Sequence, residues 1–112
     1  MSDSQLSDVK SVEKTMPYSW SVELFEKQGR CWLSWSTTAP FRAQQGRVCL
    51  YANSFPSDPT KAVAWTWDSG DHPNPFDTKQ TWGSGWCAAY IAEKSPNGPY
   101  VYLLKTPVTT ES

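Results

Sequence analysis

One segment of the chain concentrates the side chains that could do chemistry: WDSGDHPNPFDTKQTWGSGW, at residues 67–86. Its oxygen-bearing side chains recur every three residues, at Asp68, Asp71, Asn74 and Asp77. Oxygen ligands of this kind suit a hard cation such as calcium. The spacing does not fit the D-x-[DN]-x-[DN]-G calcium loop, and Asp, Asn, Ser, Gly and Pro are also the residues that build turns. We therefore predict no cofactor, with calcium as the alternative.

Catalysis would have to involve His72, the only histidine of the chain. A Ser-His-Asp or Cys-His nucleophilic site requires such a base, but no G-x-S-x-G elbow surrounds any serine. Zinc bound by His72 and the three cysteines, Cys31, Cys49 and Cys87, would lack the close ligand spacing of known zinc sites. The sequence therefore predicts a protein that is not an enzyme, with three unpaired thiols buried as small apolar residues.

Aromatic residues are the strongest functional signal, with seven Trp, five Tyr and four Phe in 112 residues. A ring flanked by Asp and Asn suits a sugar, because the ring stacks on the C–H face of a pyranose while the polar groups bond its hydroxyls. We predict lectin-like carbohydrate recognition, with glycan as partner and a homodimer for avidity. The predicted ligand-binding residues are Asp68, Asp71, His72, Asn74, Phe76, Asp77, Trp82 and Trp86.

Two other functions use the same rings. Exposed Trp and Tyr favour the water–lipid boundary, which would suit a membrane-active, cytolysin-like protein. They are also interface anchors, which would suit a structural or interaction module with an aromatic protein-binding face. Aromatic rings can also cage a quaternary ammonium group. Glycan binding, vesicle binding and a single defined oligomer distinguish the three main hypotheses.

The net charge and the N-terminal sequence narrow the classes of partner and the expected location. The formal net charge is −1, with the charges of both signs interspersed. Duplex nucleic acid needs clustered cations to displace counterions, so it is not a predicted partner. The chain shows no N-terminal apolar run that would form a signal peptide. We expect a soluble protein, either cytoplasmic or exported without a classical signal peptide.

The fold predicted from the sequence is all-β. Residues 17–112 carry short aromatic and β-branched runs separated by turn residues, which indicates a single antiparallel β-sandwich of about six strands. Residues 1–16 are polar and Ser-rich and are predicted to be a flexible N-terminal arm. The predicted strands are 18–27, 30–38, 47–52, 62–68, 85–94 and 100–106, which leaves a long loop at 68–82.

The same pattern predicts which rings are buried. Tyr18, Trp20, Trp35 and Trp65 are assigned to the core, which leaves no obvious buried place for a second set of rings: Trp32, Tyr51, Phe76, Trp82 and Trp86. In the last hairpin, a wide turn would place Tyr90 opposite or nearly opposite Tyr102, forming one continuous aromatic face.

Overall fold

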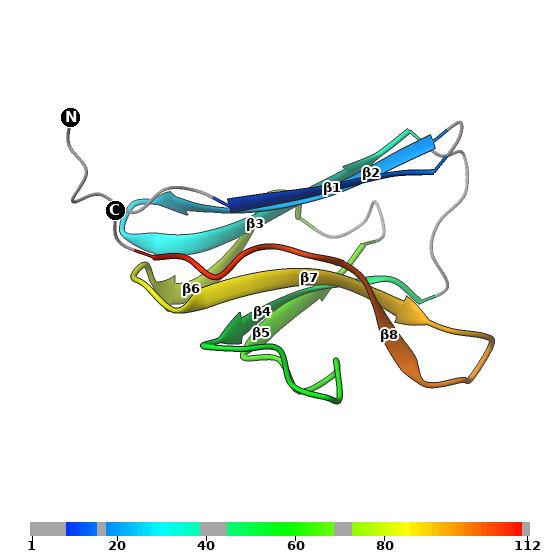
Figure 1. The fold of residues 1–112 in the computed structure, drawn as a ribbon. Coiled ribbons are helices and arrows are strands. Elements are labelled where there is room, and N and C mark those ends of the chain that lie inside the picture. Colours follow the sequence, from blue (N-terminus) through cyan, green and yellow to red (C-terminus); the bar gives the residue numbers. More distant parts are fainter. Residues whose placement is uncertain (1–8, 16–17, 39–44, 69–72, 111–112) are drawn as a thin grey trace.

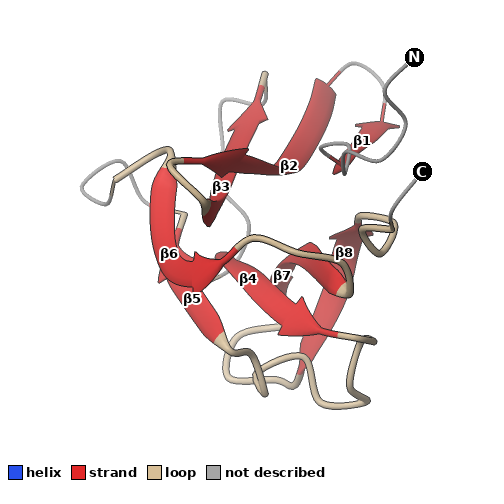
Figure 2. Ribbon diagram, turned by 90° about the vertical axis from the view of Figure 1, so that its left-hand side faces the viewer, coloured by secondary structure: helices blue, strands red, loops and turns tan. Residues whose placement is uncertain are grey.

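The computed structural model describes residues 9–15, 18–38, 45–68 and 73–110. Every regular element within these ranges is a β-strand (Figure 2). The strands are β1 (Val9–Thr15), β2 (Tyr18–Lys27), β3 (Arg30–Thr37), β4 (Arg47–Ala52), β5 (Ala64–Trp67), β6 (Phe76–Thr81), β7 (Trp86–Glu93) and β8 (Tyr100–Lys105).

The strands form two four-stranded sheets that pack face to face (Figure 1). The first sheet has the order β1-β2-β3-β6 and the second the order β5-β4-β7-β8. All pairs are antiparallel. The chain changes sheet after β3, β5 and β6. The prediction of an all-β sandwich is confirmed.

The core between the sheets comes from alternate residues of the central strands. Val22 and Leu24 of β2 and Leu33 of β3 are fully buried there. Val48 and Leu50 of β4 contact them from the opposite sheet. This alternation follows from the two-residue period of a strand, which sends successive side chains to opposite faces.

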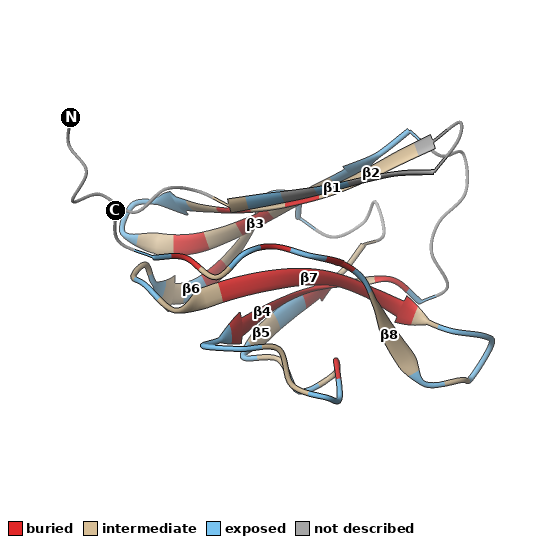
Figure 3. Cartoon of the chain, in the orientation of Figure 1, coloured by how far each residue is buried: buried red, intermediate tan, exposed pale blue. Residues whose placement is uncertain are grey.

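The second sheet is apolar on its outer face as well. All residues from Cys87 to Ala92 of β7 are buried, as Figure 3 shows along that strand. Their outward members, together with Cys49 and Tyr51 of β4, form a second buried cluster. A short continuous apolar run is what a strand covered on both faces requires.

The segment between β4 and β5, residues 53–63, covers part of that outer face. Phe55 packs edge-on against Tyr51 and Tyr102, with ring centroids 5.4 Å apart in each pair. The Tyr51 hydroxyl donates to the carbonyl of Pro59, and the Tyr102 hydroxyl donates to the carbonyl of Pro56. Three rings and two hydrogen bonds thus fix the Pro-rich segment against the sheet.

Two of the eight strands lie where no strand was predicted. β1 occupies residues 9–15 of the predicted flexible arm, and every residue of β1 pairs with a residue of β2. β6 lies inside the predicted 68–82 loop and pairs with β3. Both are edge strands, and β6 has the polar sequence FDTKQT, so neither shows the apolar alternation that identifies a strand. Main-chain hydrogen bonds to a neighbour hold them instead.

The register predicted for the last hairpin is wrong. Residues 94–99 connect β7 to β8, an even number, and this turn sets Tyr102 opposite Ile91. The pairing then shifts by one residue between Tyr90 and Ile91, so that Tyr90 lies opposite Leu104. Tyr90 points into the core, and Tyr102 joins the outer face with Ile91.

The described residues include no helix long and apolar enough to cross a membrane.

The three thiols provide a test of this burial. Cys31, Cys49 and Cys87 are buried and unpaired, as predicted. Burial raises the pKa of Cys31 to about 12 and the pKa of Cys49 and Cys87 to about 11. Because the thiolate is the reactive form, we expect a disulfide reagent at pH 8 to label the native protein far more slowly than the urea-unfolded chain, in which three thiols react. Rapid labelling of the native protein would contradict the packing.

Candidate functional site

Asp68, the first predicted ligand residue, accepts a hydrogen bond inside the chain. Its carboxylate accepts from the hydroxyl of Tyr90, whose ring is almost fully buried in the core. Its backbone N–H donates to the carbonyl of Gly46 at 3.0 Å. Asp68 therefore satisfies a buried phenol at the point where the chain leaves β5, and burial of an unsatisfied hydroxyl would be costly.

Asn74 bonds the backbone of β3. Its Nδ2 donates to the carbonyl of Trp35 at 2.8 Å, and its Oδ1 accepts from the N–H of the same residue at 3.4 Å. An amide side chain presents one donor and one acceptor in the same way as a peptide group. Asn74 thus continues the pairing of β3 one step beyond β6.

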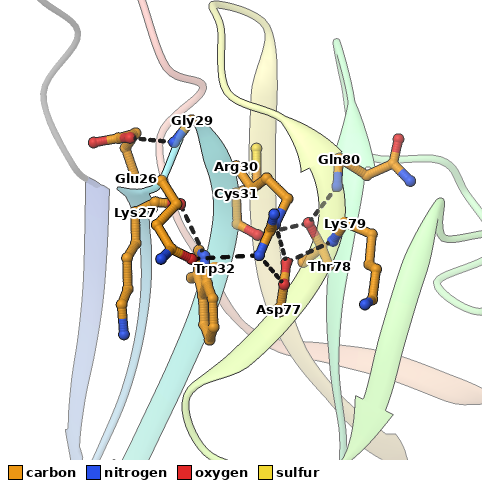
Figure 4. Close-up of polar contacts among 11 residues, drawn as sticks. Glu26, Lys27, Gly29, Arg30, Cys31, Trp32, Asp77, Thr78, Lys79 and Gln80 are labelled. Carbon is orange, nitrogen blue, oxygen red and sulfur yellow. Dashed lines mark hydrogen bonds and ion pairs between the residues drawn. The ribbon is translucent and has the colours of Figure 1, made fainter.

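Asp77 forms a forked ion pair with Arg30. Figure 4 shows the two side chains facing one another from β6 and β3. Arg30 Nε donates to Oδ1 at 3.0 Å, and Nη2 lies 2.7 Å from Oδ2. The N–H of Lys79 also donates to Oδ1 at 2.9 Å. The hydrogen bond from Arg30 is the main cause that lowers the pKa of Asp77.

The three predicted stacking rings pack against the core between the sheets. Phe76, Trp82 and Trp86 are each partly buried there. Trp86 Nε1 donates to the carbonyl of Thr81 at 2.9 Å. The expectation that these rings have no buried place is wrong, because β6 and the 82–85 turn place them against the core between the sheets. Tyr51, expected to be outside the core, is also buried, beneath Phe55.

The six described residues of the predicted set are therefore engaged at separate places. One carboxylate accepts from a core tyrosine, the amide bonds the backbone of a strand, and the other carboxylate pairs with an arginine. The three rings pack against the core. Asp71 and His72 lie outside the described residues. That this set binds a ligand stays a prediction.

A different group of side chains comes together on the outer face of the second sheet. We call it the Arg47 cluster, and it consists of Arg47 from β4, Trp65 and Trp67 from β5, and Tyr100 from β8. Trp67 lies directly opposite Arg47, and Trp65 lies two residues before it on the same side of β5. Tyr100 comes from β8, on the other side of β7, and its hydroxyl donates to the carbonyl of Gln45 at 3.0 Å.

The guanidinium of Arg47 lies on the three rings. Its Cζ is 4.2 Å from the ring centroid of Trp65, 4.8 Å from that of Trp67 and 4.5 Å from that of Tyr100. The two indoles meet edge to face at 5.0 Å and 89°. Each ring attracts the cation through its quadrupole, with about 0.5–2 kcal/mol for one such contact.

The cluster is partly exposed, and the sequence prediction missed it. Trp65 had been assigned to the core, but it is the most exposed of the seven tryptophans, at 38%. The available signal was the alternation Trp65-Thr66-Trp67, which puts two indoles on one face of a strand while buried Thr66 occupies the other. Arg47 and Tyr100 could not be added to that pair without the strand order.

Neither a metal centre nor a known relative defines the site. Within the described residues, no three or more His, Cys, Asp and Glu side chains gather in a group that could hold a metal ion. No protein-family model matches the chain, and no match was found to it among curated proteins or among solved structures. The function is therefore inferred from the side chains themselves.

The packing of Gly46 against the Asp68–Tyr90 hydrogen bond predicts that a methyl group added at Gly46 destabilises the fold. A Cβ there would overlap with Asp68 Oδ2 and lie 2.9 Å from Tyr90 Cε1, too close for either atom to stay in place. We expect Gly46→Ala to lower the free energy of unfolding by about 2 kcal/mol or more, measured by urea denaturation. Gly83→Ala is the matched control, because a Cβ at Gly83 meets nothing within 4 Å. Equal effects of the two changes would contradict the packing at Gly46.

The lowered pKa of Asp77 predicts a pH-dependent contribution to stability. A carboxylate whose pKa falls on folding stabilises the protein above its unfolded pKa, about 3.9, and loses that effect as the pH falls through the folded value. We expect Asp77→Asn to have a lower Tm than the wild type at pH 7, and the difference to shrink below about pH 4. Glu23→Gln, on β2 at the other side of β3, is the control. A difference that did not change with pH would contradict the ion pair.

Proposed function

We propose that the protein is a non-catalytic, lectin-like carbohydrate-binding protein, and that the Arg47 cluster makes the sugar contacts. The observation that carries this proposal is the position of Trp65, a partly exposed indole beside a guanidinium that lies on aromatic rings. Sugar recognition needs this combination: an apolar plane and directed polar donors within a few ångströms of each other.

The chemistry of each group suits a pyranose. The exposed part of the Trp65 indole packs on ring C–H groups, and the guanidinium of Arg47 donates to ring hydroxyls. Trp67 and Tyr100 hold the guanidinium in place, so less side-chain freedom is lost when the ligand binds. Val63, two residues before Trp65 in the chain, is 48% exposed and offers a further apolar side chain.

The proposed site differs from the one predicted from the sequence, although the function class is the same. In the 68–82 segment, the described carboxylates and the amide already bond groups of the chain itself. At the Arg47 cluster, the exposed ring and the cation face the same side of one sheet.

Two other proposals remain distinct outcomes of the same tests. A membrane-active protein would bind vesicles through exposed apolar side chains. The large exposed apolar side chains among the described residues are Val12, Val63, Trp65 and Leu103, which lie on three different parts of the fold.

A homodimer, which we also propose, would pair two sites and raise avidity. Sedimentation velocity measures it separately from sugar binding.

Replacement of Trp65 tests the proposed function. We expect the wild type to bind at least one glycan on a broad array, and a soluble monosaccharide or oligosaccharide to compete. Trp65→Ala should then weaken binding about 30-fold, the effect of removing an aromatic anchor worth about 2 kcal/mol, as measured by calorimetry.

The matched control is Trp32→Ala. Trp32 also lies beside a cation, with Lys27 Nζ 4.8 Å from its ring centroid, but it is on the first sheet. Both variants should keep the far-UV spectrum and cooperative unfolding of the wild type. Absence of any glycan binding by the wild type would contradict the function, and equal losses in the two variants would contradict the site.

A further inference from the structure

The two arginines that the structure describes have different kinds of partner. Arg30 forms a forked ion pair with Asp77, which takes up its Nε and Nη2. Arg47 lies on three aromatic rings, and its buried Nε has no hydrogen-bond partner. No ion pair joins Arg47 to any carboxylate of the described residues.

The neighbouring carboxylates of the described residues form no ion pair with Arg47. Glu93, opposite Tyr100 at the end of β7, accepts from the N–H of Asn97 at 3.3 Å. Asp68, next in sequence to Trp67, accepts from Tyr90 on the core side of the sheet. Within the described residues, the guanidinium of Arg47 therefore lies on aromatic rings and forms no ion pair.

A second cation lies on the same face of this sheet. Lys105 Nζ is 5.3 Å from the ring centroids of both Phe55 and Tyr102. Like Arg47, it contacts aromatic rings, and Lys105 is exposed. Arg47 lies opposite Ile91 and Lys105 lies opposite Ala89, so the two cations flank β7 from β4 and β8. An anionic ligand lying across β7 would find a cation on each side of this strand.

We infer that the ligand of the Arg47 cluster is an acidic sugar, a pyranose bearing a carboxylate such as a hexuronic or sialic acid. A guanidinium is a planar fork that matches a carboxylate through two parallel hydrogen bonds. Aromatic rings attract the cation without supplying a carboxylate or carbonyl acceptor, so its Nη donors can bond the sugar. The sugar ring stacks on Trp65 while its carboxylate pairs with Arg47. This inference rests on the proposed carbohydrate-binding function and adds the charge of the sugar.

The test compares acidic oligosaccharides with their own methyl esters. Hexuronic-acid and sialic-acid oligosaccharides are printed beside the corresponding esters, so that each pair differs in the carboxylate charge and in one added methyl group. The full chain is expected to bind the acid about tenfold or more tightly than the ester. Arg47→Gln should remove that preference, and Arg47→Lys, which keeps the charge without the fork, should restore only part of it.

Lys27→Gln is the matched control, because Lys27 also lies on an indole but belongs to the first sheet. It should leave the acid preference unchanged. Melting curves establish that each variant is folded before its binding is compared, and Arg47→Lys serves if Arg47→Gln fails to fold.

The outcomes separate the two proposals. Equal binding of acid and ester, with loss of both in Trp65→Ala, would overturn the acidic-sugar inference and leave the carbohydrate function standing. Acid preference that survives in Arg47→Gln would also overturn the inference. Absence of binding to every glycan, acidic or neutral, would overturn the proposed function and the inference together.

Discussion

The second sheet is apolar on both faces, and the remainder of the structure depends on how its outer face is covered. Its inner face packs against the first sheet in the usual way of a sandwich. No sheet of the described residues packs against its outer face, yet Cys49, Cys87 and Ile91 are buried there. The 53–63 segment covers one end, with Phe55 against two tyrosines. The rings of the Arg47 cluster cover the other end.

This division explains why one end of the face suits binding. At the 53–63 end, tyrosine hydroxyls donate to proline carbonyls, so rings and polar groups are used within the chain. At the other end, a cation sits among rings that supply no carboxylate. The rings around the guanidinium of Arg47 supply no carboxylate, whereas the fork of Arg30 is taken up by Asp77. The same residue type thus has a structural role on the first sheet and a ligand-binding role, by our proposal, on the second.

Local signals in the sequence predicted the central strands well. The alternation in 18–27 and the apolar run at 47–52 gave β2 and β4 with the bounds that the structure has. The edge strands β1 and β6 were missed because main-chain pairing, rather than an apolar pattern, holds them. The candidate site was misplaced because it depends on long-range pairing. Trp65 joins Arg47 only through the β4–β5 register, and Tyr100 joins only because β7 pairs with β4 on one side and with β8 on the other.

The most direct test of the central claim is the NMR signal of the Arg47 side chain. A guanidinium held on indole and phenol rings has its Hε resonance shifted upfield by ring currents, and Arg47→Lys identifies the peak by its loss. Titration with a hexuronic-acid oligosaccharide should move this resonance and the Trp65 indole resonance together, while the methyl ester moves them much less. An Arg47 Hε at the position of a solvent-exposed arginine, unchanged by the acid, would contradict the account.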